Sequence, residues 1–490
     1  MIPFTPELLP FVILGLTPIV MMTVLCLYRN SCLNTLLALL GLIGTYCSLG
    51  NVTLKSPLAI ANYLIIDSVS LFFIKLILIT GVFLVLFSQF YLDKNQLGKA
   101  GIKFYEMKEE YQMVLLLSLL GGIFLVCSQH MILFFLALEL LTIPFYGMIA
   151  FAKTQTRSLE ASLKYLILAS CASAFILFGF ALLFASTGSM EFNENMGYMV
   201  YNINKLPLCY LTGLIFVLSG LAFKLSAAPF HMWAGDVYEG SIVPTTMALT
   251  TLSKAAVLGV FVKFLLFFKL HEISVTESLL IILSTLSMTL GNFLAYKQKN
   301  LKRLLAYSSV THMGYMLAAF VFLGNDSLQA LLFYISAYIL TSLCAFGVLS
   351  SLTENGKGPE TLEDLRGLFW HHPYYAFVMV VVVLSLMGIP MTAGFIGKYQ
   401  IIASALKSIY WPILAFLVVN AIFSLGYYLR ILVSLLVQED EKASSLAGKG
   451  QLTEKAILGF LAFLILYLGM NPSGLFELSK YTIEHLSMTP

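Results

Sequence analysis

Five ionisable side chains lie deep inside long apolar stretches of this sequence. They are Glu139 in FFLALELLTIPF, Lys164 in EASLKYLIL, Lys224 in GLAFKLSAAPF, Lys254 in TTLSKAAVL and Lys398 in GFIGKYQII. A charge in the hydrocarbon core of a membrane costs roughly 2.5–3.5 kcal/mol on insertion scales, so such residues usually face the protein interior and mark ion or proton pathways. The chemistry predicted from these positions is therefore transfer of protons or ions.

The composition is that of a protein with many membrane spans. Hydrophobic residues make up 59% of the chain and charged residues only 11%, whereas soluble domains carry about 25% charged residues. Apolar runs of about 20 residues, long enough to cross a ~30 Å hydrocarbon core, recur from one end of the chain to the other. Fourteen membrane helices are predicted, near residues 7–28, 33–49, 66–92, 111–128, 130–152, 159–186, 208–227, 241–268, 274–296, 303–323, 327–352, 374–406, 411–437 and 453–471.

The hydrophilic segments leave no room for a soluble catalytic domain. The longest ones, around 92–110, 353–372 and 438–454, are about twenty residues each, too short to fold alone. The seven cysteines are scattered, without the close spacing that zinc or iron–sulfur ligation needs, and no Walker or dinucleotide-binding motif is present. We therefore expect no metal or cofactor in this chain, and a net charge of +3 gives no reason to invoke nucleic acid.

The loop charges predict an orientation. Loops after odd-numbered spans hold sixteen Lys and Arg residues, against five in the other loops. The positive-inside rule then places the odd-numbered loops in the cytoplasm. Both termini are expected on the periplasmic side of a bacterial inner membrane.

Two of the predicted spans carry sequences that interrupt a helix. The stretch 208–227 runs into Ser226-Ala227-Ala228-Pro229, and the stretch 374–406 contains Met387-Gly388-Ile389-Pro390. Proline removes a backbone donor and small residues loosen a helix, so helices 7 and 12 are predicted to be discontinuous. Prolines also merely kink many membrane helices, but here each break adjoins a lysine, Lys224 or Lys398, which favours a functional interruption.

The spacing of the two breaks predicts an internal repeat. Pro229 and Pro390 lie five spans apart, and an odd number of spans makes the second copy enter the membrane from the opposite side, as in many transporters. The expected organisation is helices 1–3 in residues 1–110, a first repeat of helices 4–8 in 111–270, an inverted repeat of helices 9–13 in 271–437, and helix 14 in 438–490.

The buried charges have functional and structural interpretations. Glu139 is expected to pair with Lys224, because a buried carboxylate and amine can share a proton state that either neighbour alters; a protonated structural carboxyl is the alternative. Lys254 lies in mid-span without a local carboxylate, so a relay is favoured over a structural role. Asp236 and Glu239 could gather protons at the cytoplasmic side or simply form a solvated loop.

Lys164, Lys398 and two histidines remain more ambiguous. Lys164 follows Glu160 by one turn, so an i, i+4 surface pair competes with a buried role. Lys398 lies just past the second break, where a snorkelling lysine is the alternative. His231 and His312 titrate near physiological pH and could pass protons, but structural histidines are nearly as common.

Several long runs resemble one family of membrane proteins. They are SLEASLKY, GLAFKLSAAPFHMWAGDVYEG, NLKRLLAYSSVTHMGY, RGLFWHHP and LSLMGIPMTAGFIGKY. In this order they resemble the antiporter-like membrane subunits of the proton-pumping NADH:quinone oxidoreductase, respiratory complex I, most strongly over residues 110–435. The resemblance implies fourteen helices with two inverted five-helix repeats, and a lysine at position 398 favours the subunit N type over subunit M, which has a glutamate there.

The resemblance also implies roles for individual residues. It makes Glu139 and Lys224 a central pair, Lys254 a middle relay and Lys398 a distal lysine, with Lys164, His231 and His312 accessory. Lys75 lies outside the family pattern and inherits no role. FMN, iron–sulfur clusters and quinone are expected in other subunits, and the partners are the other membrane-arm and peripheral-arm subunits, the lipid bilayer and protons.

The function implied is that of a translocase subunit. Protons would cross the membrane along buried Lys, Glu and His side chains, driven by electron transfer from NADH to quinone in other subunits. Two rivals remain open: a subunit of a multisubunit cation/proton antiporter, and a membrane scaffold that conducts no protons.

Overall fold

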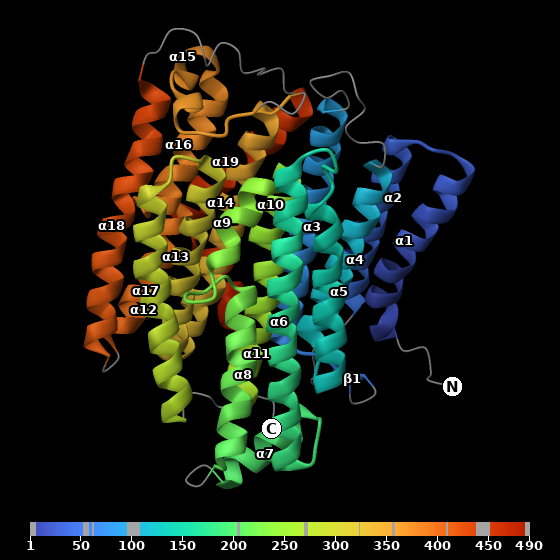
Figure 1. Cartoon of the computed structure of the whole chain (residues 1–490), viewed down its shortest axis with the longest axis vertical. Helices are drawn as coiled ribbons and strands as arrows, with labels where there is room; N and C mark the ends of the chain where they lie inside the picture. Colours follow the sequence, from blue (N-terminus) through green and yellow to red (C-terminus); the bar gives the residue numbers. More distant parts are fainter. Residues whose placement is uncertain are drawn as a thin grey trace.

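The protein is almost entirely helical in the computed structural model (Figure 1). The structure describes residues 6–51, 58–60, 63–95, 108–202, 206–268, 273–322, 324–354, 358–407, 410–437 and 451–485. Twelve helices in these ranges are long and apolar enough to cross a membrane. They coincide with twelve of the fourteen predicted spans, and the other two predicted spans fall on interrupted helices.

The helices of the N-terminal half run from one edge of the bundle to its middle (Figure 1). A short hairpin of β1 (Leu58–Ile60) and β2 (Leu64–Ile66) precedes α3. The helices are α1 (Leu9–Leu27), α2 (Ser31–Ser48), α3 (Ser68–Lys94), α4 (Lys108–Cys127), α5 (Met131–Ile149), α6 (Thr156–Thr187), α7 (Phe192–Asn202), α8 (Leu208–Lys224), α9 (Met232–Gly240), α10 (Val243–Ala248) and α11 (Lys254–Phe267).

The helices of the C-terminal half complete the bundle, with α18 at the edge opposite to α1 (Figure 1). They are α12 (Ser274–Lys297), α13 (Leu301–Val321), α14 (Asn325–Leu352), α15 (Leu368–His371), α16 (Pro373–Met387), α17 (Ala393–Leu406), α18 (Trp411–Leu436), α19 (Leu452–Met470) and α20 (Ser473–Glu484). Short 3-10 turns at Pro6–Leu8, Leu49–Asn51 and Glu363–Leu365 link some of them.

Three spans form the centre of the bundle. The most apolar window of α13 is 100% buried inside the protein, and those of α14 and of the span Val243–Leu266 are each 94% buried. The corresponding windows of α1 and α19 are only 28% buried, because they lie at the periphery. Protein covers these central helices on all sides, so they have no single apolar face turned toward a core. Their polar residues must find partners within the protein.

Both predicted helix interruptions are present. Helix α8 ends at Lys224, and α9 begins only at Met232 after a segment with Ser226 at φ 58° and a cis bond between Ala228 and Pro229. Helix α16 ends at Met387, and α17 begins at Ala393 after Gly388 at φ 83°. The discontinuities predicted in the seventh and twelfth spans, residues 208–227 and 374–406, are therefore confirmed.

Some predictions concern residues outside the described ranges. These include most of the hydrophilic segments around 92–110 and 438–454, and with them the loop cations Lys99, Lys103, Lys442 and Lys449. The inverted relation of the two repeats and the domain boundaries stay predictions.

Candidate functional site

Lys224 is held at the first interruption, at the C-terminal end of α8. Its side chain is buried, at 3% exposure. Its Nζ donates a 2.9 Å hydrogen bond to Thr142 Oγ1 on α5. The amine therefore lies where one half of the broken span stops, against a neutral partner from a neighbouring helix.

Glu139 does not form the direct ion pair with Lys224 that the sequence suggested. It is half-buried on α5, where it accepts a hydrogen bond from Ser173 Oγ on α6. Thr142, one turn further along α5, takes the position against the lysine instead. Glu139 still lies close enough to Lys224 to interact with it electrostatically, so the two are coupled through space and not by contact.

Lys254 lies in the middle of a span whose helix is locally widened. Residues Leu249–Ser253 form a π-helical turn between α10 and α11, and such turns are rare and frequent at functional sites. Lys254 follows directly and is fully buried, at 0% exposure. Its Nζ donates a 2.7 Å hydrogen bond to Ser309 Oγ on α13 and lies 5.9 Å from the centre of the Tyr338 ring.

His312 stands between Lys254 and the second interruption. One ring nitrogen, Nδ1, is 2.6 Å from the Tyr334 hydroxyl, and the other, Nε2, is 3.0 Å from the Tyr428 hydroxyl. The Tyr428 hydroxyl is also bonded to Ser308 Oγ, next to the Ser309 that holds Lys254. Ser308, Tyr428, His312 and Tyr334 thus form a hydrogen-bonded run across α13, α18 and α14, and Ser308 is the residue next to Ser309 in the chain.

Lys398 caps the broken end of α16. It is 5% exposed, and its Nζ donates to two carbonyl oxygens at that end, Leu386 O at 2.7 Å and Met387 O at 3.0 Å. The last carbonyls of a helix have no partner within the helix and carry partial negative charge, which suits an ammonium group. The amine also lies 5.3 Å from the centre of the Tyr315 ring, so the snorkelling interpretation of Lys398 is wrong.

Lys164 lies at the surface, away from the buried groups around Lys224, Lys254 and Lys398. Its side chain is 43% exposed and pairs with Glu160 at 2.7 Å and with Asp236 at 2.8 Å. The surface i, i+4 pair that the sequence allowed is therefore present. Asp236 and Glu239 lie on α9 and not in a solvated loop, and both also pair with Arg303, at 3.1 and 3.0 Å. These charges line a cavity of about 220 Å³.

His231 lies in the segment between α8 and α9. It is 4% exposed, and neither ring nitrogen makes a hydrogen bond of normal geometry in the described part of the chain. Its ring centre is 6.3 Å from that of Tyr307. It therefore adjoins the first interruption but is not joined to Lys224 by a hydrogen bond.

Sequence reasoning missed the tyrosines around His312 and one buried ion pair. Tyr334 and Tyr338 come from α14 and Tyr428 comes from α18, and no local pattern brings them to one histidine on α13. Lys263 forms a 3.3 Å ion pair with Asp67, although the two residues are almost two hundred positions apart. By contrast, the Asp67 position just before an apolar run is a recognisable N-cap signal, and its side chain does cap α3.

Lys75 does not join the buried amines, and the His, Cys, Asp and Glu residues of the described ranges do not form a metal site. Lys75 is exposed on α3 at the edge of an apolar cavity of about 390 Å³. Within the described ranges, no three His, Cys, Asp or Glu side chains are grouped so as to hold a metal ion.

A helical bundle with two interrupted spans, each with a buried lysine at its break, defines the class of antiporter-like membrane proteins. Residues 128–424 match the family described as NADH:quinone oxidoreductase/Mrp antiporter, TM. The chain is 37% identical over 481 residues to the NADH-quinone oxidoreductase subunit N of Ectopseudomonas mendocina (strain ymp), covering 96% of this chain and 95% of that protein. This chain therefore belongs to the NADH:quinone oxidoreductase/Mrp antiporter family.

Solved structures show the same fold. A chain of respiratory complex I from Thermus thermophilus is 31% identical, with a TM-score of 0.79, and the match covers 96% of this chain and 99% of that one. A chain of the Mrp complex from Dietzia sp. DQ12-45-1b has a TM-score of 0.84 at 19% identity, with 99% and 98% covered. At that identity the second likeness concerns the fold alone.

Proposed function

We propose that this chain is the N-type membrane-arm subunit of a proton-translocating NADH:quinone oxidoreductase and that it moves protons through its buried lysines. The observation that carries the proposal is the set of partners of Lys224, Lys254 and Lys398. All three amines are at most 5% exposed, and each donates to a hydroxyl or a carbonyl, with no carboxylate within ion-pair distance in the described ranges.

Neutral partners make these amines responsive to distant charge. A salt-bridged lysine keeps its proton because its partner stays beside it, whereas an amine held only by hydroxyls or carbonyls changes its protonation when a nearby charge appears or leaves. A unit charge about 4 Å away supplies ~4 kcal/mol at an effective dielectric constant near 20. Moving one charge across 100 mV costs ~2.3 kcal/mol, so such a change is large enough to drive a proton step.

The order of groups suggests a path. Glu139 acts electrostatically on Lys224 at the first break, and His312 interacts electrostatically with both Lys254 and Lys398. Between the last two lysines, Ser308, Tyr428, His312 and Tyr334 offer hydroxyl and imidazole groups in sequence. The step from Lys224 to Lys254 is expected to use water. His231 and Lys164 are accessory in this scheme, near the first break and at the predicted cytoplasmic surface.

The coupling chemistry is assigned to other subunits. The relative from Ectopseudomonas is a subunit of an NADH-quinone oxidoreductase and the Thermus neighbour is part of respiratory complex I. We infer that FMN, iron–sulfur clusters and quinone are bound elsewhere in the same complex, so this chain contributes translocation and no redox step to the translocase. The complex would lie in a bacterial inner membrane, with both termini of this chain on the periplasmic side.

A test must separate a relay from a scaffold. In membrane vesicles containing the assembled oxidoreductase, NADH oxidation and acidification of the lumen are measured together for Lys224→Ala and Glu139→Ala, with Lys75→Ala as the control because that exposed lysine lies outside the line of buried amines. A relay predicts lost coupled turnover in the first two variants and normal pumping in the control. Unchanged pumping per NADH in all three would identify a scaffold, and sodium-dependent transport without NADH would identify a cation/proton antiporter.

A further inference from the structure

One membrane lysine, Lys75, takes no part in the proposed proton path. It is exposed on α3, seven residues after Ser68 at the start of that helix, which places it ~10 Å into the span at a rise of 1.5 Å per residue. Its amine makes no hydrogen bond or ion pair with any residue that the structure describes. An ammonium group at that depth is costly in hydrocarbon, so it requires either the membrane interface or an anionic partner.

Lys75 lies on the wall of an apolar cavity of about 390 Å³. Leucine, isoleucine and phenylalanine side chains of α3, α14, α19 and α20 form most of its surface. Hydroxyl groups on the walls are bonded within the protein: Ser68 donates to Thr482 O at 2.7 Å, and Ser336 donates to Leu332 O at 2.9 Å. Lys75 is the one charged side chain among the described residues that line the cavity, so an apolar interior adjoins a single cation.

The cavity has the dimensions of a hydrocarbon chain and not of a helix. Its lining residues on α3 run from Ser68 to Thr80, a length of ~18 Å at the rise of an α-helix. A helix of that length and ~10 Å diameter would fill roughly 1,400 Å³, several times the volume of the cavity. The length is close to half of a ~30 Å hydrocarbon core. The cavity therefore suits one extended acyl chain of a single leaflet.

The polar rim of the cavity lies at the end of the membrane where α3 begins. The bond from Ser68 to Thr482 O places the end of α20 beside the start of α3. Tyr46 in the last turn of α2 and Tyr481 on α20 line this rim and are exposed. Tyrosines are enriched at membrane–water interfaces, and the long stem of a lysine lets the amine of Lys75 reach toward the same level. An ammonium and two phenol hydroxyls thus lie at headgroup level, next to the apolar interior.

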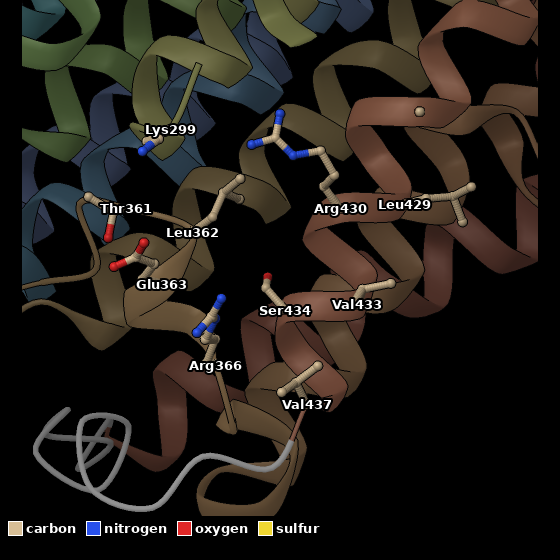
Figure 2. Close-up of a pocket in the computed structure, with 11 residues that line it drawn as sticks. Lys299, Thr361, Leu362, Glu363, Arg366, Leu429, Arg430, Val433, Ser434 and Val437 are labelled. Carbon is tan, nitrogen blue, oxygen red and sulfur yellow. The ribbon is translucent and has the colours of Figure 1, made fainter. Parts of the chain in front are cut away.

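Another cavity is a poorer site for an anion. It has a volume of about 610 Å³ and is lined by Lys299, Glu363, Arg366 and Arg430 (Figure 2). Side chains of both signs therefore face it, Arg366 already has an interaction partner in the structure, and Arg430 donates to backbone carbonyl oxygens. The cavity beside Lys75 has no such competing charge on its walls.

We propose that the cavity beside Lys75 holds an acyl chain of an anionic phospholipid whose phosphate pairs with the Lys75 amine. The chain lies between α3, α14 and α19, and the hydroxyls of Tyr46 and Tyr481 donate to oxygens of the headgroup. No carboxylate lines the cavity within the described ranges, and the flanking residues 52–57 and 486–490 contain no Asp or Glu. The ammonium of a zwitterionic headgroup would therefore find no partner, which favours a lipid with net negative charge. In the predicted orientation this lipid belongs to the periplasmic leaflet.

The proposal is tested by native mass spectrometry of the full-length chain, titrated with phosphatidylglycerol or with phosphatidylcholine. Lys75→Gln is expected to weaken the tightest phosphatidylglycerol site about tenfold, equivalent to ~1.4 kcal/mol, whereas Lys75→Arg keeps the charge and should retain the site. Lys407→Gln is the matched control, because it removes one exposed lysine of the predicted periplasmic side that lies outside the cavity. Ile79→Trp is a further variant, which fills the cavity, retains Lys75 and is also expected to weaken lipid binding.

Several results would overturn the assignment. They are an equal loss in Lys407→Gln, equal affinity for phosphatidylcholine, unchanged binding in Ile79→Trp, and full displacement of the lipid by inorganic phosphate. In the purified oxidoreductase complex, the wild type should also retain more phosphatidylglycerol than Lys75→Gln, and equal contents would show that another subunit occupies the cavity. These measurements concern lipid binding and not proton translocation, so their failure leaves the proposed function untouched.

Discussion

Two buried lysines on one helix are expected to give opposite phenotypes when each is replaced by methionine. Lys254 is fully buried, and its amine donates to the Ser309 hydroxyl, with no carboxylate in ion-pair distance among the described residues. Lys263, on the same helix α11 and 4% exposed, is paired with Asp67. The two lysines lie on the same helix and are almost equally buried. They differ in whether a carboxylate is paired with the amine.

The expected energies follow from these partners. Lys254→Met removes the cost of placing a lysine in a membrane span, ~2.5–3.5 kcal/mol, and loses a hydrogen bond from a charged group, ~1.5–3 kcal/mol. The net change therefore lies between about 0.5 kcal/mol destabilising and about 2 kcal/mol stabilising. Lys263→Met leaves Asp67 without its partner, which costs ~3–5 kcal/mol in a fully buried pair. About 2–3 kcal/mol is expected here, because Asp67 is 12% exposed and retains its hydrogen bonds to Ser70.

Thermal unfolding in detergent and proton pumping per NADH in vesicles are measured on the same preparations. Lys254→Met should unfold at or above the wild-type temperature and pump no protons through this chain. Lys263→Met should unfold at a lower temperature and pump normally below that temperature. The reasoning is refuted if Lys254→Met keeps full pumping, or if Lys263→Met loses pumping while it remains folded.

Three further substitutions test single contacts. Thr142→Val removes the hydroxyl that accepts from Lys224 and should reduce pumping, whereas Thr142→Ser should retain it; equal loss in both would point to packing. Tyr428→Phe removes the hydroxyl 3.0 Å from His312 and should slow NADH-driven pumping about tenfold, equivalent to ~1.4 kcal/mol, and a normal rate would exclude that hydroxyl from the path. Gly388→Ala places a side chain at φ +83°, which costs ~1–2 kcal/mol, so the unfolding temperature should fall, and an unchanged temperature would show that the break relaxes freely.

Local sequence information was sufficient for the membrane helices and their interruptions. Apolar runs of about twenty residues identify spans because every backbone group in hydrocarbon must be paired within the helix. The small and proline residues at Ser226–Pro229 and Gly388–Pro390 break that pairing locally, and the helices do end at Lys224 and Met387. These features depend on neighbours in the chain, so they can be inferred from neighbours alone.

Side-chain partners were predicted less well, because they depend on helix packing. Glu139 was expected to contact Lys224, but rotation of α5 presents Thr142 to the amine and turns Glu139 toward Ser173. Lys164 lies in an apolar stretch, yet its helix is at the periphery and the residue is 43% exposed. Rotation of a helix about its own axis by a few tens of degrees changes which side chain faces the neighbouring helix. No local sequence pattern encodes that rotation.

The sequence by itself determined that this protein is a bundle of membrane helices with lysines at two helix breaks, because hydrophobic length and proline chemistry act over a single turn or span. Only the tertiary structure decided which groups the lysines touch. Lys254 meets Ser309, and His312 meets Tyr334 and Tyr428, because α13 and α14 are packed at the centre, where side chains from helices far apart in the chain converge.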